Sequence, residues 1–380
     1  LFPYTTLFRS AIKMAPLVKE FKSNKDLFET RVCVSGQHRE MLDQVLKLFD
    51  IKPNYDLDIM KESQTLSDVT TSILLGMNSV FKDFIPDVVF VHGDTSTTFA
   101  ASLATFYQQI SVAHIEAGLR TGNIYSPWPE EANRQLTTQI TSYHFAPTET
   151  SKANLLRENV NEKSIIVTGN TVIDALFLAL EKIKSNTGFE DNVIKTIESS
   201  VNNSKFSIVN SKFILVTGHR RENHGQGFIN ICTALREIAL RYQDIDIIYP
   251  VHLNPNVQKP VKALLSDIDN VYLIAPLQYE QFVYMIHKSY FIITDSGGVQ
   301  EEAPSLGKPV LVIRDTTERP EALDAGTVKL VGTDTDLIVK EAQQLLESES
   351  AYSAMSKASN PYGDGSACEI IVSTMKRELV

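Results

Sequence analysis

Acidic side chains that directly follow apolar runs are the first candidates for chemistry in this sequence. In VFVHGDTSTTFAA (89–101), Asp94 comes after a β-branched run and stands beside a series of Thr and Ser residues. Such an Asp is either the N-terminal cap of the following helix or a carboxylate that projects from a strand end to act on a ligand. The pattern gives the two alternatives about equal weight.

A second acidic segment, HIEAGLRTGNIYSPWPEEANRQLT (114–137), contains Glu116 at the end of an apolar run. A carboxylate in this position is either placed for function or paired with a nearby Arg. Glu130 and Glu131 follow two prolines, and we expect them to open a helix because acids stabilise its positive end. That role accounts for Glu130 or Glu131 but not for Glu116.

Two later segments carry groups that suit phosphate. VTGHRRENHGQGF (216–228) places His219 and Arg220 after a predicted strand, and such donors stabilise a pyrophosphate or a developing negative charge. TDSGGVQEEAPSLGKP (294–309) joins a strand to a helix at 296–298, where backbone N–H groups can approach phosphate. Glu302 lies about one helical turn further on, in a position to accept hydrogen bonds from a ribose.

The elements that must position these groups alternate between short β-branched runs and helical stretches. This alternation predicts parallel sheets with crossover helices, which is the α/β class. The expected strands are 31–36, 87–93, 111–118, 142–147 and 164–170, followed by 213–218, 246–252, 270–276, 290–295 and 309–315.

Two successive sets of strands predict two Rossmann-like halves, and the polar stretch 185–212 is the expected connection between them. Open α/β sheets bind ligands at the carboxyl ends of their strands, where the motifs stand. We therefore expect the active site in the cleft between the halves.

Composition excludes several other classes of protein. The 380 residues carry a formal net charge of -10, which argues against a sequence-independent nucleic-acid binder. No apolar run approaches the roughly 20 residues that span a bilayer, so we expect no membrane partner. The three cysteines, Cys33, Cys232 and Cys368, are widely spaced and odd in number, which favours a reducing compartment and neither a disulfide framework nor a zinc site.

The first ten residues, LFPYTTLFRS, match a frame translation of a common sequencing-library adapter. We interpret 1–10 as an adapter-derived segment in place of the natural N-terminus. The segment lacks the basic region, the long apolar region and the cleavage site of a signal peptide. From Ala11 onward, AIKMAPLVKEF predicts a helix without its preceding strand.

Eight segments along the chain together resemble the non-hydrolysing UDP-N-acetylglucosamine 2-epimerases, and the resemblance covers Ala11 to Val380. These segments are HGDT, HIEAGLRTG, PEEANR, VTGHRREN, PVHLNPN, TDSGG-QEEAPSLGKPV, RDTTERPE and NPYGDG. The resemblance implies a GT-B fold, in which two Rossmann-like domains with parallel sheets face a central cleft. It divides the chain into an N-terminal domain (11–178), a UDP-binding domain (179–361) and a C-terminal helix (362–380) that packs back on the N-terminal domain.

The resemblance also implies an activity. Members of this family interconvert UDP-GlcNAc and UDP-ManNAc by eliminating UDP, forming 2-acetamidoglucal, and adding UDP again after protonation from the other face. They serve bacterial cell-surface polysaccharide synthesis in the cytoplasm, are typically homodimers, and use neither NAD nor a catalytic metal.

The resemblance also implies catalytic and binding roles for the residues that match the family's motifs. Glu116 and Glu130 are the expected acid–base pair, with Asp94 as helper or alternative base. His219 and the loop Ser296, Gly297, Gly298 are expected to hold the diphosphate. The remaining positions of the implied UDP site are Lys13, Phe282, Glu302 and Arg319. Of these, Phe282 is expected near the uracil.

Two departures from the family pattern concern binding. The family's first strand ends in a Gly-Thr-Arg-Pro-Glu segment, and its Arg falls on Phe8 here. Some relatives also bind a second UDP-GlcNAc as an activator, and Gln37, Arg220 and His252 match positions used there. Two further activator positions, a Gln and an Arg in the family, are Glu40 and Ser63 in this sequence.

Three alternatives remain beside this reading. A GT-B glycosyltransferase shares the nucleotide-binding half, but acceptor recognition does not explain PEEANR beside HIEAG. A hydrolysing UDP-GlcNAc 2-epimerase releases ManNAc and UDP, and the full set of motifs favours the non-hydrolysing branch. An inactive nucleotide-sugar sensor would lose the carboxylates, whereas Asp94, Glu116, Glu130 and His219 are all present.

Overall fold

The computed structural model describes residues 6–379 except positions 38, 202 and 204, and describes side chains from Ser10 onward. Residues 1–5 of the expected adapter-derived segment thus lie outside the described residues, and of Phe8 only the backbone is described. The helix expected from Ala11 already begins at Thr6, as α1 (Thr6–Ser23). The chain divides into two compact units. Within the described residues, the N-terminal unit holds 6–177 and 362–379, and the C-terminal unit holds Leu178–Pro361.

The sheet of the N-terminal unit is parallel and runs in the order β3-β4-β5-β6. Its strands are apolar and flanked by crossover helices, as parallel sheets require. Among the described residues, β1 (Cys33–Val34) and β2 (Tyr55–Asp56) form a separate parallel pair. The four strands are β3 (Val88–His92), β4 (Ser111–Ile115), β5 (Tyr143–Ala146) and β6 (Ile165–Val167).

Several helices of the N-terminal unit have Thr caps or acidic residues in their first turns. Thr65 and Asp68 form a reciprocal capping box at the start of α3, and Thr148 caps α6. The helices are α2 (Arg39–Leu48), α3 (Leu66–Asp83), α4 (Ser96–Tyr107), α5 (Glu130–Gln139), α6 (Glu149–Arg157), the first half of α7 (Thr171–Ser185) and α16 (Ala367–Leu379).

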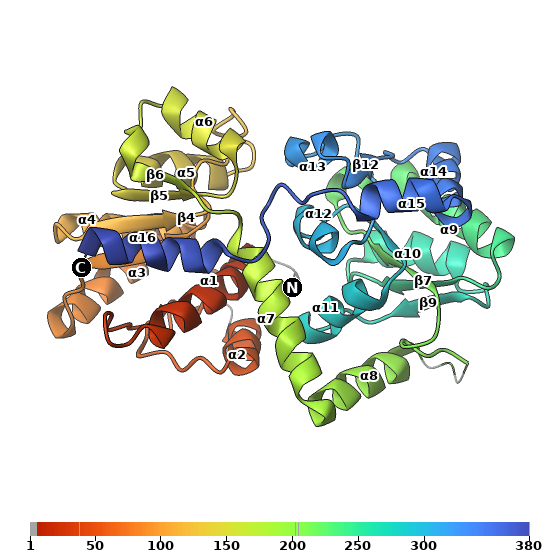
Figure 1. The fold of residues 1–380 in the computed structure, drawn as a ribbon, viewed down its shortest axis with the longest axis horizontal. Coiled ribbons are helices and arrows are strands. Elements are labelled where there is room, and N and C mark those ends of the chain that lie inside the picture. The colour runs from red at the N-terminus through yellow and green to blue at the C-terminus, as the bar shows by residue number, and fades with distance from the viewer. Residues whose placement is uncertain (1–5, 38, 202, 204, 380) are drawn as a thin grey trace. The chain divides into compact units, whose positions relative to one another are not determined.

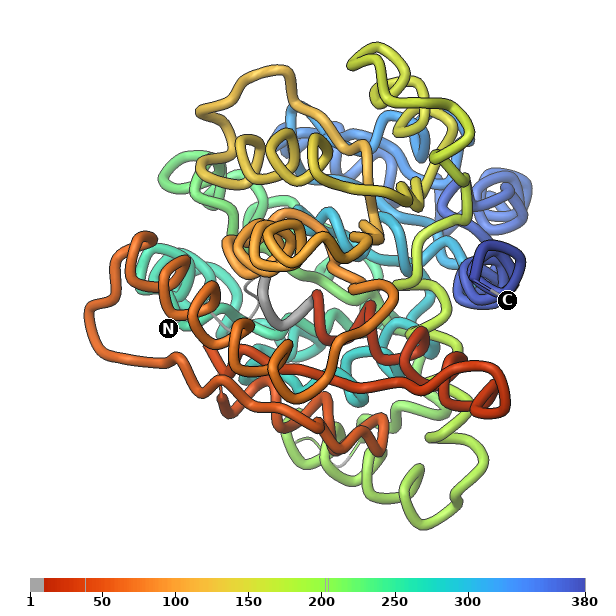
Figure 2. Tube along the Cα trace, turned by 90° about the vertical axis from the view of Figure 1, so that its left-hand side faces the viewer, coloured from red at the N-terminus to blue at the C-terminus, as the bar shows by residue number. Residues whose placement is uncertain are grey.

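The C-terminal helix packs within the N-terminal unit. In Figure 1, α16 runs beside α1, with which it is in contact, and Figure 2 views α16 nearly along its axis. Leu17 and Phe21 of α1 join Ile371 and Met375 of α16 in one buried apolar cluster. The carboxylate of Asp174 accepts a hydrogen bond from the Cys368 N–H at 2.8 Å, which satisfies a donor in the first turn of α16.

The sheet of the C-terminal unit is also parallel, in the order β12-β11-β10-β7-β8-β9. This order places β7 and β10, which precede the two phosphate-suited motifs, side by side. The strands are β7 (Phe213–Thr217), β8 (Asp246–Pro250), β9 (Val271–Ile274), β10 (Phe291–Thr294), β11 (Val310–Val312) and β12 (Val328–Leu330).

Helices cover this second sheet, and its core includes Leu235, Ile247 and Ile338. The main helices are α8 (Thr187–Val201), α9 (Gln226–Arg241), α10 (Pro255–Leu265), α11 (Tyr279–Lys288), α12 (Gly297–Glu302), α13 (Pro320–Asp324), α14 (Thr335–Glu347) and α15 (Glu349–Ser356). Short 3-10 turns are η1 (Glu162–Ser164), η2 (Arg221–Asn223) and η3 (Ala303–Leu306). None of the helices in the described part of the chain is long and apolar enough to cross a membrane.

The α/β class with parallel sheets is confirmed, but the expected connection at 185–212 is wrong. The chain passes from one unit to the other inside α7, between Phe177 and Leu178. Residues 187–201 form α8 of the C-terminal unit, with Val193, Ile197 and Val201 buried at a spacing of four residues. This apolar stripe supplies a packing face, although the surrounding sequence is polar.

Candidate active site

Asp94 follows β3 directly and does not cap the next helix. The cap of α4 is Thr95, whose hydroxyl accepts from the Thr98 N–H at 3.2 Å. The Asp94 carboxylate instead accepts from Arg134, with 2.5 Å between Oδ2 and Nη2. The capping alternative for Asp94 is therefore wrong, and its buried carboxylate is paired with a cation.

Arg134 also binds the neighbouring acid of its own helix. Its Nη1 lies 2.9 Å from Oε2 of Glu131, and Glu131 is fully buried. Glu131 also accepts from the Thr121 N–H and from Gln135 Nε2, each at 3.2 Å. Burial would raise the pKa of Glu131, but these donors, Arg134 first, hold it below its usual value.

Glu130 and Glu131 occupy the first turn of α5, as expected for acids that open a helix. The two differ in burial, because adjacent helical positions point about 100° apart. Glu131 is enclosed by its donors, whereas Glu130 is half-buried at the first position of the helix. Glu130 is thus the more accessible carboxylate of the two.

Glu116 follows β4 in a strained backbone conformation. Its φ of +64° lies in the left-handed region, which costs a residue other than glycine about 1–3 kcal/mol. Its Oε2 forms a buried ion pair with Lys13 Nζ and accepts from Asn170 Nδ2 at 2.8 Å. His92 Nε2 lies 3.8 Å from the same oxygen. Packing that maintains this strain fixes the carboxylate in one place.

The Arg that follows Glu116 in its motif has another partner in the structure. The nearby Arg120 binds Glu158 in a bidentate pair, at 2.7 and 2.8 Å. Glu116 pairs with Lys13, which the family resemblance placed in the UDP site. Lys13 is buried on α1. In this structure Lys13 therefore neutralises a candidate catalytic carboxylate.

The carboxyl ends of β3 and β4 bring the two acidic motifs together. The strands pair in register, with His92 opposite Ile115, so Asp94 and Glu116 follow adjacent strand ends. A Cβ placed on Gly93 would lie 3.9 Å from Oε1 of Glu116, which puts that oxygen beside the loop of Asp94. We call Asp94, Glu116 and Glu130 the carboxylate group.

In the C-terminal unit, His219 is held by Asp295 of β10's loop. The Asp295 carboxylate accepts from the backbone N–H groups of His219 and Arg220, both at 2.7 Å, and lies 3.3 Å from His219 Nδ1. Burial would raise the pKa of Asp295, but His219 and these N–H groups lower it. Asp295 therefore fixes the orientation of the imidazole.

A second histidine stacks on His219. The rings of His219 and His252 lie 5.5 Å apart with an interplanar angle of 15°. Burial and the neighbouring His219 lower the pKa of His252. Burial and Arg314 likewise lower the pKa of Arg220. Arg220 and His252, two of the expected activator positions, thus lie in the surroundings of His219.

The glycine loop leads from β10 into α12. Ser296 is the N-cap residue of this helix, and its side chain makes no capping bond. The Arg319 guanidinium packs against the loop, since a Cβ on Gly297 would lie 3.3 Å from its Cζ. Arg319 also binds Glu301 at 2.8 Å. Gly297 and Gly298 are buried, and a side chain at Gly297 would displace the guanidinium.

The remaining expected UDP residues belong to α11 and α12. The Tyr279 hydroxyl donates to Oε1 of Glu302 at 3.2 Å, and both side chains are buried. Burial and the Glu302 charge hold the pKa of Tyr279 well above its ordinary value. Phe282, one turn after Tyr279, is buried on α11.

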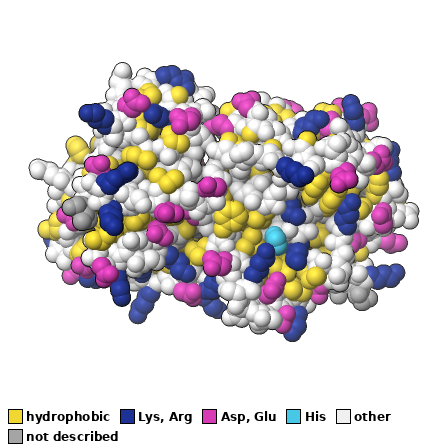
Figure 3. Space-filling view, in the orientation of Figure 1, with side chains coloured by type: hydrophobic (Ala, Val, Ile, Leu, Met, Phe, Trp, Pro, Cys, Tyr) yellow, Lys and Arg dark blue, Asp and Glu magenta, His cyan; other side chains and the backbone are white. Residues whose placement is uncertain are grey.

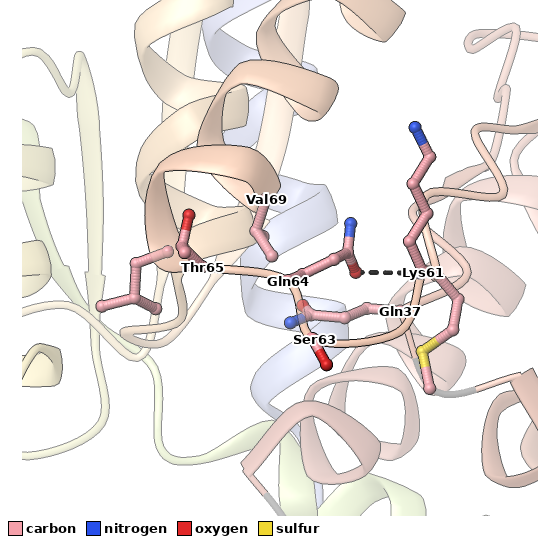
Figure 4. A pocket seen from close by; sticks show the side chains of 8 residues that line it. Gln37, Lys61, Ser63, Gln64, Thr65 and Val69 are labelled. Carbon is pink, nitrogen blue, oxygen red and sulfur yellow. Dashed lines mark hydrogen bonds between the residues drawn. The ribbon is translucent and has the colours of Figure 1, made fainter.

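A cavity of about 340 Å³ opens in the N-terminal unit around Gln37 and Ser63. Figure 4 shows Gln37 reaching toward Ser63 while the Lys61 side chain points away. Gln64 closes the loop by accepting from the Lys61 N–H at 3.1 Å. Glu40, the other departure from the family pattern, is exposed on α2 and does not line this cavity.

Four residues that sequence reasoning missed contact the expected site residues: Arg134, Asn170, Asp295 and His92. Each stands inside or next to a motif that drew attention for another residue. Arg134 is part of PEEANR, and Asn170 ends the predicted strand segment SIIVTGN. The motifs therefore pointed to the right segments of the chain. Which carboxylate or histidine each residue contacts depends on the tertiary structure, so the sequence did not predict it.

Figure 3 shows acidic and basic side chains interspersed over the visible face. No group of three or more His, Cys, Asp or Glu side chains in the described part of the chain is arranged to hold a metal ion.

The sequence of this chain matches a family of known enzymes. The model of the UDP-N-acetylglucosamine 2-epimerase family matches residues 19–376. A UDP-N-acetylglucosamine 2-epimerase of Campylobacter jejuni is 60% identical over 367 residues, which are 96% of this chain and 94% of that one.

Two solved structures share the fold. A UDP-GlcNAc 2-epimerase from Neisseria meningitidis bound to UDP-GlcNAc has a TM-score of 0.83 at 55% identity, over 97% of both chains. The Methanocaldococcus jannaschii enzyme in complex with UDP-GlcNAc and UDP has a TM-score of 0.76 at 33% identity, over 97% of both chains.

These findings confirm the expected GT-B fold and the resemblance on which it rests. The family match covers most of the chain, and the relatives are matched over nearly their whole length. The chain belongs to the UDP-N-acetylglucosamine 2-epimerase family, a family of isomerases.

Proposed function

We propose that the chain interconverts UDP-GlcNAc and UDP-ManNAc by elimination and re-addition of UDP, without net hydrolysis. A base removes the C2 proton as the bond between C1 and the UDP oxygen breaks, giving 2-acetamidoglucal and UDP. UDP then adds back to C1 while an acid protonates C2 from the opposite face, which inverts that centre and balances the atoms.

The carboxylate group supplies the acid and the base in this proposal. Glu116 and Glu130 are the pair, because Glu116 is fixed in place and Glu130 is the accessible acid of α5. Asp94 assists as a neighbouring carboxylate, held by Arg134. Two carboxyl groups that exchange roles between the directions of reaction satisfy microscopic reversibility.

The C-terminal unit binds the nucleotide in this proposal. His219, oriented by Asp295, stabilises the diphosphate as it leaves, together with the loop of Ser296, Gly297 and Gly298. Arg319 and Glu302 contact the nucleotide, and Phe282 lies near the uracil. Lys13, which pairs with Glu116 in the structure, is the remaining residue of the proposed UDP site.

The observation that carries the proposal is the strained, cation-paired Glu116 beside the Asp94 loop. Strain of this kind persists where a side chain must be held for function. The test is incubation of the chain with UDP-GlcNAc and separation of the products by ion-exchange chromatography. UDP-ManNAc at equilibrium with UDP-GlcNAc supports the proposal, whereas steady accumulation of free ManNAc and UDP moves the chain to the hydrolysing type.

We also propose that the protein is a homodimer, joined through its N-terminal unit. Large apolar side chains on the adjacent helices α3, α4 and α5 are at least half exposed. Such exposure marks association surfaces when the side chains are contiguous. These residues are Leu75, Phe106, Tyr107 and Leu136. Light scattering of wild type and of the double variant F106E/Y107E measures the mass, and an unchanged mass contradicts this surface.

A second UDP-GlcNAc is the proposed activator, and the cavity around Gln37 is its candidate site. The Oε1 atom of Gln37 is buried without a hydrogen-bond partner among the described residues, so it can accept a ligand donor. Sigmoidal dependence of the reverse reaction on UDP-ManNAc, removed by trace UDP-GlcNAc, supports activation. A hyperbolic dependence with no response to UDP-GlcNAc contradicts it.

We place this reaction in the cytoplasm, where nucleotide sugars supply bacterial cell-surface polysaccharide synthesis. The three cysteines are free thiols in the structure, which is compatible with a reducing compartment.

A further inference from the structure

We propose that Asn170 is a positioning residue for the Glu116 carboxylate, and that residues 362–365 set the position of Asn170. These residues lead from the C-terminal unit back into α16 of the N-terminal unit, and we call them the returning chain. The inference rests on the proposed function, since it concerns a carboxylate assigned to catalysis there. All the residues involved belong to the N-terminal unit.

Both ends of the Asn170 amide are used. Its Oδ1 accepts from the Val172 N–H at 3.1 Å, which satisfies a free donor at the start of α7. Its Nδ2 donates to Oε2 of Glu116 at 2.8 Å. Because the oxygen is committed to the helix, the amide can present only its donor to the carboxylate. Asn170 is also buried, so water does not compete for this bond.

The bond constrains the Oε2 atom of Glu116. Lys13 Nζ and Asn170 Nδ2 both bind Oε2, whereas Oε1 lies on the side of Gly93. Two donors on a single oxygen fix the plane of the carboxylate. A fixed plane holds Oε1 toward the Asp94 loop, and loss of either donor lets the carboxylate rotate.

The returning chain fixes the backbone of Asn170. Its N–H donates to the carbonyl oxygen of Tyr362 at 2.7 Å. The two segments meet at glycines: a Cβ on Gly169 would lie 3.1 Å from the Tyr362 carbonyl oxygen, and a Cβ on Gly363 would lie 3.2 Å from the Gly169 Cα. A Cβ at either glycine would come closer than ordinary contact, so the two backbones would have to move apart.

Further contacts hold the same segment in place. A Cβ on Gly365 would lie 2.5 Å from the ring of Phe177 on α7, and Asp174 of α7 holds the first turn of α16. The first two turns of α7, which follow Asn170, are therefore in contact with the returning chain and the start of α16. This arrangement gives the C-terminal segment a role in placing a catalytic group, beyond packing against α1.

Two variants of Asn170 separate positioning from folding. Asn170→Ser and Asn170→Asp both keep a side-chain oxygen suited to the helix start. The Ser side chain loses the donor to Glu116, and the Asp side chain replaces it with a negative charge. Loss of one hydrogen bond to a charged group predicts roughly a tenfold to hundredfold decrease in kcat, with KM changed less than about threefold.

The pH profile supplies a measurement that a purely structural role would not change. In Asn170→Asp the added charge raises the pKa of the Glu116 carboxyl, so the limb of the kcat profile that reports Glu116 moves to higher pH by about one unit. Carbon-13 NMR of Glu-labelled protein, with Glu116→Gln to assign the signal, measures the same shift without activity. This readout stays valid if the wild type fails to epimerise, so failure of the proposed function and failure of this inference are distinguishable.

Two glycine variants test whether the returning chain sets the position of Asn170. Gly363→Ala, at a φ of +108°, forces its Cβ against Gly169, whereas Gly326→Ala introduces a Cβ at a φ of +73° with no atom within 4 Å. We expect Gly363→Ala to lower kcat at least about fivefold more than Gly326→Ala does. Wild-type kcat in Asn170→Ser, an unmoved Glu116 titration in Asn170→Asp, or equal kcat in the two glycine variants would overturn the inference.

Discussion

Arg134 Nη2 lies 2.5 Å from Asp94 Oδ2, and this buried ion pair joins residues 40 positions apart in the chain. The same guanidinium binds the fully buried Glu131 at 2.9 Å. One cation therefore links the loop after β3 to the first turn of α5, and it orders the two acids of that turn. Glu131 holds Arg134, which leaves Glu130 as the acid available for proton transfer.

The neighbouring acids Glu130 and Glu131 should respond differently to the same substitution. Glu130→Gln should lower kcat by roughly a hundredfold or more and leave the free energy of unfolding within about 0.5 kcal/mol. Glu131→Gln should lower the free energy of unfolding by roughly 1–3 kcal/mol, because buried donors lose a charged partner. Steady-state kinetics and urea unfolding of both variants measure this, and the reverse pattern would assign the chemistry to Glu131.

Arg134→Lys should separate charge from geometry. A Lys side chain keeps the positive charge but cannot bind Asp94 and Glu131 through two fixed nitrogens. We expect kcat to fall by roughly tenfold or more while the protein stays folded, with circular dichroism as the check on folding. Unchanged kcat in a folded Arg134→Lys protein would mean that Asp94 needs only a nearby charge.

His114 should make stability depend on pH. It is fully buried, with Nε2 2.7 Å from the Gly93 carbonyl oxygen, and burial lowers its pKa from 6.5 to about 3. Between these values the unfolded chain binds a proton that the folded chain does not, so stability is lost as pH falls below 6.5. From pH 6.5 to 5 this group should remove about 2 kcal/mol.

The variant His114→Gln isolates that contribution. The amide can still donate to the Gly93 carbonyl oxygen but does not titrate. The free energy of unfolding should decrease by about 2 kcal/mol less in His114→Gln than in wild type between pH 7 and pH 5. Equal decreases in the two proteins would show that His114 does not carry the pH dependence.

Gly297 should be required for the position of Arg319. A Cβ at Gly297 would lie 3.3 Å from the guanidinium carbon, closer than nearly all Cβ contacts. Gly297→Ala should weaken UDP binding by roughly threefold to tenfold in calorimetric titration, because the displaced Arg319 loses its place beside the loop. Gly188→Ala on α8 is the control, since its Cβ would meet only Asn186 Oδ1 at an ordinary 3.6 Å.

The strand ends were predictable from the sequence because apolar runs there stop abruptly at polar residues. The segments around Asp94, Glu116, His219 and Ser296 all follow strands that the structure contains, namely β3, β4, β7 and β10. The alternation of strands and helices also fixes the class as α/β, since parallel strands require crossover elements. Short strands such as β2 and β12 were missed because two or three residues carry too little pattern.

Long-range pairing was not predictable in the same way. Lys13 and Glu116 are 103 positions apart, and Asn170 and Glu116 are 54 apart, so no local pattern joins them. The difference between Glu130 and Glu131 depends on which face of α5 is covered. Glu131, Arg134 and Thr138 share one face of α5 by their spacing, but nothing in their residue types marks that face as the buried one.

Deuterium incorporation tests the central claim most directly. The chain is incubated with UDP-GlcNAc in D₂O, and proton NMR follows C2 of both nucleotide sugars, with Glu116→Gln and Glu130→Gln as comparisons. The account predicts that wild type forms UDP-ManNAc with deuterium at C2 and that both variants slow this incorporation by roughly a hundredfold or more. UDP-ManNAc that keeps the original C2 proton, or incorporation at the wild-type rate in both variants, would contradict it.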